Sequence, residues 1–172
     1  MMMRKMFFLS VLWFLPLVVG QLGVPIEMGQ AVFAADSPQK TRKVPAMRES
    51  TYKKLAEAQV MIDPESAPRE EGEPAPKPTG TPQTAISLLL DLLPSKGLNS
   101  YELAQIWNTL AFAYYTVEDI PNTIRSYENI LNQGTITEAL ELSSLRALFQ
   151  LHYGEGNYHK AIAFIDRWQT LK

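Results

Sequence analysis

Apolar residues recur with a helical period over most of the chain after residue 46. The period is clearest in two stretches, Trp107 to Tyr114 and Leu145 to His152, which carry ring or aliphatic side chains at i, i+3, i+4 and i+7. Side chains at this spacing share one face of a helix, and an apolar face is normally buried. Together with the turn residues between such stretches, the pattern predicts helices over residues 46–62, 82–93, 100–117, 120–133, 138–153 and 157–171. The predicted fold class is therefore all-α.

One local pattern occurs three times, in which a turn is followed by a small residue and then by isoleucine. The isoleucines, Ile86, Ile124 and Ile162, are 38 residues apart both times, and Trp107 and Leu145 have the same separation. Regular self-similarity at such a length is typical of stacked helical repeats. We therefore expect about three antiparallel helical hairpins.

The first hairpin contains additional residues. Tyr52, which begins the matching stripe there, lies 55 residues before Trp107, about 17 more than the repeat period. The segment 63–80 carries five prolines, which disfavour both a helix and a central strand: Pro64, Pro68, Pro74, Pro76 and Pro78. We expect a disordered, proline-rich loop over residues 63–80.

Cap residues support the predicted helix boundaries. Thr81 before Pro82 suits a helix start with proline at its first position. Asn99, followed three residues later by Glu102, has the spacing of a capping box. Thr137 can cap the fifth helix through its hydroxyl group.

The N-terminal segment has the features of an export signal. Arg4 and Lys5 precede an uncharged apolar run over residues 6–20, as in secretory signal peptides. We expect cleavage after Ala34, a signal peptide over 1–34, a flexible linker over 35–45 and a repeat domain over 46–172. The alternative is an uncleaved membrane anchor, because residues 6–26 carry no charge and a span needs ~20 residues. Both interpretations place the folded part outside the cytoplasm.

Charge and composition narrow the possible functions. The chain has 16 basic and 18 acidic residues and a formal net charge of -2, so no overall basic field attracts nucleic acid. It has no cysteine, which excludes disulfides, thiolate zinc sites and a lipid-modified cysteine. We expect His152 to fill space in the fold and His159 to be exposed. No phosphate loop or nucleophile motif occurs, so we expect neither enzymatic activity, nor a cofactor, nor a metal site.

The repeats resemble the tetratricopeptide (TPR) pattern, W-x2-L-G-x2-Y followed by A-x3-F. The matching positions are Trp107, Leu110, Ala111, Tyr114, Thr123 and Tyr127 in the second unit, with Leu145, Leu148 and Ala161 in the third. Phe149 and His152 depart from the pattern, the closing proline is missing, and the unit is longer than the usual 34 residues. The resemblance implies a right-handed TPR-like solenoid.

A narrower resemblance suggests a biological setting. Residues 42–49, 52–59 and 96–102 are similar to periplasmic TPR proteins encoded beside TonB–ExbB–ExbD systems of Gram-negative bacteria. This similarity implies a periplasmic scaffold for protein–protein interaction, accessory to TonB-dependent transport. If the signal is not cleaved, the protein is anchored in the inner membrane and faces the periplasm.

In the TPR pattern, partners bind to the first helix of each hairpin, on a concave surface. The corresponding residues are Lys53, Glu57, Gln105, Asn108, Phe112, Tyr115, Ser143, Arg146, Gln150 and Tyr153. This mixture of polar and aromatic side chains suits an extended or helical peptide, whereas the alternative is a solvated face with some packing between repeats.

A second functional hypothesis is a self-assembling structural module, or a fragment of a longer TPR array. Repeat arrays need a polar terminal cap, but the last predicted helix carries Ile162, Ile165, Trp168 and Leu171. A homo-oligomer would bury part of this face.

Overall fold

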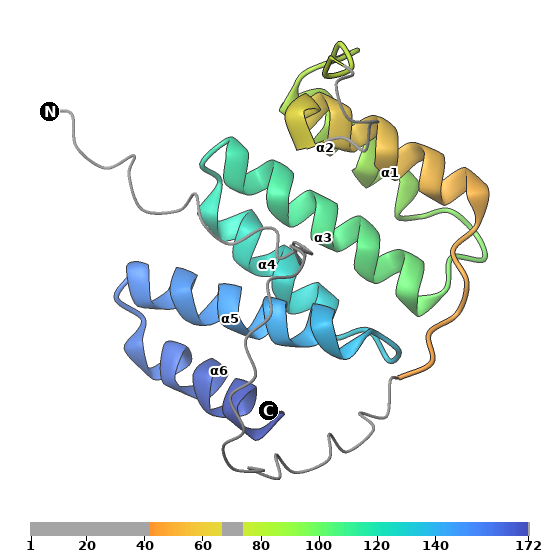
Figure 1. Ribbon diagram of the computed structural model, residues 1–172. Helices are drawn as coiled ribbons and strands as arrows, with labels where there is room; N and C mark the ends of the chain where they lie inside the picture. The colour runs from red at the N-terminus through yellow and green to blue at the C-terminus, as the bar shows by residue number, and fades with distance from the viewer. Residues whose placement is uncertain (1–41, 67–73, 172) are drawn as a thin grey trace, which may run out of the picture. The chain divides into compact units, whose positions relative to one another are not determined.

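The computed structural model describes residues 42–66 and 74–171. Every regular element in these ranges is a helix (Figure 1): α1 Glu49–Ile62, the 3-10 turn η1 Pro64–Ser66, α2 Pro82–Leu92, α3 Ser100–Thr116, α4 Ile120–Leu131, α5 Glu138–Gly154 and α6 Tyr158–Thr170. The predicted all-α class is confirmed, and each predicted helix coincides with an observed one. The predicted signal peptide and its cleavage site, most of the predicted linker, and residues 67–73 of the predicted loop lie outside the described residues.

Local hydrogen bonds explain where the helices begin. The side chains of Thr81, Asp119 and Thr137 each accept a hydrogen bond from a peptide N–H three residues later. Asn99 and Glu102 form the predicted capping box in both directions. These contacts satisfy peptide N–H groups that have no partner within the helix, so these starts are determined locally.

Most helices contact only their neighbours in the sequence. Contacts join α1 with α2, α2 with α3, and so on to α6, and α1 also touches α3. Figure 1 shows α3, α4, α5 and α6 following one another side by side. Contact between successive elements is typical of helical repeats. No helix in the described residues is long and apolar enough to span a bilayer.

Helix α3 lies at the centre of the buried core. Ile106 and Leu110 pack with residues of α1 and α2, whereas Ala104 packs with Ile130 and Leu140 of α4 and α5. Trp107, which is half-buried, contacts both groups. Because α3 is covered on two sides, its apolar residues connect the first hairpin to the rest of the fold.

The positions that match the TPR pattern are mostly inaccessible. Tyr114 is 8% exposed, Trp107 and Tyr127 are half-buried, and six others are essentially buried: Leu110, Ala111, Thr123, Leu145, Leu148 and Ala161. Ala111 and Thr123 lie on α3 and α4, which are in extensive contact. Small side chains at such positions allow two helices to approach closely.

Two segments differ from the sequence-based expectation. Helix α1 begins at Glu49 because residues 46–48 are held in a non-helical form. Asn99 Nδ2 donates to the Ala46 carbonyl at 2.9 Å, and the Arg48 peptide N–H donates to Glu102 at 3.1 Å. The predicted loop 63–80 contains the turn η1. A single 3-10 turn beginning with proline needs no hydrogen bond from the proline nitrogen.

Candidate functional site

The predicted partner-binding residues all lie on α1, α3 and α5, and none of them is buried. Phe112, Tyr115 and Tyr153 are 37%, 42% and 61% exposed. Four polar members are exposed, namely Lys53, Glu57, Ser143 and Arg146. Three are half-buried, namely Gln105, Asn108 and Gln150. The helices therefore keep the predicted binding positions accessible while they bury the repeat motif.

The accessible positions repeat with the same period as the buried ones. Asn108 corresponds to Arg146, and Tyr115 corresponds to Tyr153, each 38 residues later. On α5 the ring of Tyr153 lies 6.1 Å from that of Phe149 and 5.5 Å from that of Tyr158. Contact with these two rings already restricts the side chain of Tyr153. It would therefore lose less conformational entropy when a partner binds.

A buried carboxylate attaches the segment before α1 to the start of α3. Glu102 is fully buried and accepts hydrogen bonds from Arg48 Nε at 2.8 Å, Thr51 Oγ1 at 2.7 Å and the Asn99 peptide N–H at 3.0 Å. Burial alone would raise the pKa of Glu102, but the hydrogen bonds from Arg48, Asn99 and Thr51 outweigh it and lower the pKa to about 2. This cluster is structural, and sequence reasoning identified only its capping box.

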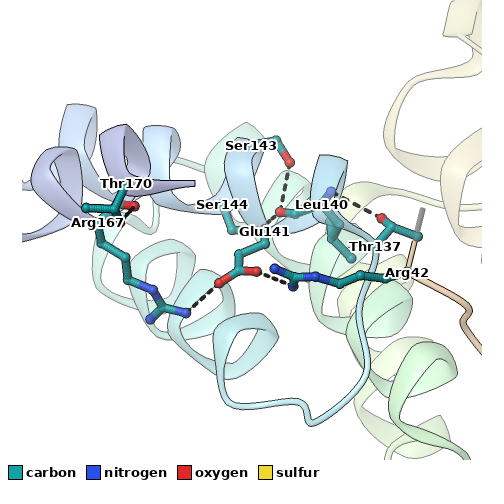
Figure 2. Close-up of polar contacts among 8 residues, drawn as sticks. All are labelled: Arg42, Thr137, Leu140, Glu141, Ser143, Ser144, Arg167 and Thr170. Atoms are coloured by element: carbon teal, nitrogen blue, oxygen red, sulfur yellow. Dashed lines mark hydrogen bonds and ion pairs between the residues drawn. The ribbon is translucent and has the colours of Figure 1, made fainter. Parts of the chain in front are cut away.

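A second carboxylate lies between two arginines, one on either side (Figure 2). Arg42 Nη1 donates to Glu141 Oε2, and Arg167 Nη2 donates to Glu141 Oε1 at 2.7 Å. Glu141 is 7% exposed in the first turns of α5, whereas the arginine side chains are 44% and 49% exposed. Burial raises the pKa of Glu141, but the two guanidinium groups more than offset it and hold the pKa below its usual range.

These three residues line an open cleft of about 250 Å³. Its other walls are Leu131 at the end of α4 and the turn residues Gln133, Gly134, Thr135 and Ile136. This cleft is not predictable from the sequence, because Arg42 and Arg167 lie 99 and 26 residues from Glu141. No periodic pattern connects positions at such separations.

The two histidines occupy the predicted environments. His152 is 3% exposed and stacks on Phe164 with ring centroids 5.5 Å apart, while His159 is exposed. Neither ring nitrogen of His152 has a hydrogen-bond partner in the described part of the chain. Within the same residues, no group of three or more potential ligands is placed to hold a metal ion.

The described residues define an all-α protein with a helical-repeat-like arrangement. Comparison of the chain with protein-family models, curated proteins and solved structures gives no match. The TPR and TonB-system resemblances therefore stay predictions that rest on the residues themselves.

Proposed function

We propose that this protein is a periplasmic TPR-type scaffold that binds a peptide or protein partner through the first helices of its hairpins. The observation that supports this function best is the contrast between two residue sets on the same helices. Leu110 and Leu148 are fully buried, whereas Tyr115 and Tyr153, which are also 38 residues apart, are exposed, as is Phe112. Exposed aromatic side chains at repeated positions favour a role in binding, because aromatic residues contribute strongly to the affinity of protein interfaces.

The composition of this surface suits a polypeptide ligand. Asn108, Phe112 and Tyr115 are spaced as neighbours along one side of α3, and Arg146, Gln150 and Tyr153 are spaced identically on α5. Aromatic and arginine side chains contribute most of the affinity at protein interfaces. The amide groups can bond the backbone of a bound peptide. The similarity to periplasmic proteins of TonB systems suggests a component of such a complex as the partner.

The proposal can be tested with the periplasmic domain of a TonB-type protein from the same cell and with extracts of the cell envelope. Substitution of Phe112 and Tyr115 together by alanine should weaken binding about tenfold or more, because each ring lost at an interface centre costs about 1 kcal/mol or more. Arg125→Ala, on α4, is the matched control and should bind like the parent. Equal affinities for the parent and the double variant would rule out this surface.

Self-association is a second candidate function, supported by the last hairpin. Tyr158 and Ile162 of α6 are 58% and 57% exposed, and Tyr153 of α5 contacts Tyr158. Burial of these three side chains against a second copy would remove apolar surface from water. Sedimentation analysis should then show concentration-dependent oligomers that Ile162→Glu abolishes, whereas a parent chain that stays monomeric would exclude this function.

A further inference from the structure

The cleft beside Glu141 has more positive charge than its single carboxylate can neutralise. Arg42 and Arg167 each contribute one positive charge, and Glu141 contributes one negative charge. The cleft therefore has an excess of one positive charge, although the chain as a whole has a net charge of -2. An anion is attracted to such a local excess, more strongly where the surroundings are partly shielded from water.

Both guanidinium groups keep donors for a ligand. Each donates to Glu141 through one nitrogen, and neither has another acceptor among the described residues. A guanidinium group carries five N–H donors in a planar fork that matches the two oxygens of a carboxylate. Because Glu141 is almost fully buried and holds one arginine with each oxygen, it fixes the two forks relative to each other.

The size and lining of the cleft indicate what kind of anion it suits. A volume of about 250 Å³ corresponds to roughly eight water molecules, enough for a carboxylate group and a few attached carbon atoms. Leu131 provides apolar wall, Ile136 is 6% exposed, and Gln133 and Thr135 provide polar side chains. One excess positive charge matches a carboxylate, whereas a dianionic phosphate would bring a second negative charge close to Glu141.

We propose that this cleft binds the carboxylate group of an aliphatic ligand. The remaining N–H groups of Arg42 and Arg167 donate to the two carboxylate oxygens, and the aliphatic part of the ligand packs on Leu131. Two sources supply this chemistry, namely the C-terminal residue of a protein and a small free carboxylic acid. The site lies on other residues than the proposed partner-binding surface, so neither proposal depends on the other.

Calorimetric titration of the full chain can test the site. The probes are N-acetyl-leucine, N-acetyl-leucinamide, an octapeptide ending in leucine with a free carboxylate, and inorganic phosphate. N-acetyl-leucine should bind, and its amide should not. Tighter binding of the octapeptide identifies a protein C-terminus as the source, while equal or weaker binding identifies a small acid. Failure of both carboxylate probes to bind, or tighter binding of phosphate, would overturn the proposal.

Variants then locate the binding. Arg42→Gln and Arg167→Gln should each weaken binding of N-acetyl-leucine about tenfold, because each removes hydrogen bonds to a charged group. Arg125→Gln is the control that leaves binding unchanged. Thermal melting shows which variants fold, and if Arg167→Gln does not fold, Arg42→Gln, which lies outside every helix, still decides. Binding of N-acetyl-leucine that Arg42→Gln leaves unchanged would contradict this assignment.

Discussion

Glu102 carries a negative charge where no part of its side chain reaches water. The charge is tolerated because Arg48, Thr51 and Asn99 all donate to the carboxylate. At the scale of single residues, this cluster and Glu141 show the same arrangement, in which a carboxylate near a helix start holds a distant arginine. In both cases one arginine comes from the segment before α1, and Glu141 also holds Arg167 of α6.

The Glu102 cluster predicts a loss of stability in acid. The pKa of Glu102 is lowered from 4.5 to about 2 in the folded chain, so its contribution is complete above pH 4.5 and is lost as the pH falls towards 2. The difference corresponds to about 3 kcal/mol. Urea unfolding across this pH range should show the decrease. Glu102→Gln should be less stable than the parent at pH 7 and should lose less stability in acid, whereas Glu57→Gln, at an exposed position, should behave like the parent.

His152 predicts a separate effect at milder pH. Burial and the charge of Lys160 lower the pKa of His152 below 6.5, and they outweigh the opposite effect of Glu128 and Glu155. The unfolded chain then binds the proton more readily, so stability is complete above pH 6.5 and is lost as the pH falls below that value. The melting temperature should be lower at pH 5.5 than at pH 7.5, both for the parent and for the control variant His159→Gln. His152→Phe keeps a ring against Phe164 and should remove much of the difference; an unchanged difference would contradict this role.

At the scale of helices, α3 and α4 are in extensive contact and carry the buried small side chains of Ala111 and Thr123, and α3 also joins the two parts of the core. Ala111 and Ala104 are fully buried, so a larger side chain at either position would have to displace its neighbours. The side chain of Trp107 contacts both parts of the core. The stability of the second hairpin should therefore respond both to added and to removed volume on α3.

Two substitutions test this packing from opposite directions. Ala111→Leu should destabilise by about 1–3 kcal/mol through overpacking, and Trp107→Ala should cost about 3 kcal/mol, the lower end for a lost aromatic because Trp107 is only half-buried. Urea unfolding measures both values. Arg125→Ala, at an exposed position of α4, should change stability little. If Ala111→Leu and Trp107→Ala unfolded like the parent, the assigned contact between α3 and α4 would be wrong.

At the scale of the whole molecule, export is predicted from N-terminal residues that lie outside the described ranges. The charged and apolar segments over residues 4–20 predict a secreted chain whose mature N-terminus is at or near Ala35. N-terminal sequencing of protein from the envelope fraction measures this directly. Retention of Met1 in that fraction would favour the anchored alternative, and recovery of the chain only from the cytoplasm would contradict export.

The sequence by itself determined the helices and their repetition. Apolar spacing, the caps at Thr81, Asn99 and Thr137, and the 38-residue period are local or regular features, so they can be read without knowing which helices touch. The same pattern separated buried Leu110 and Leu148 from exposed Phe112 and Tyr153.

Only the tertiary structure decided which charges meet. Arg48 lies 54 residues from Glu102, and Arg42 lies 99 residues from Glu141. These partners come together because packing of the hairpins brings the start of α3 and the start of α5 to the segment before α1. The same contacts hold residues 46–48 outside a helix and make α1 begin at Glu49. Exposed arginines are common and carry no periodic signal, so their pairing becomes visible only when the helices are in place.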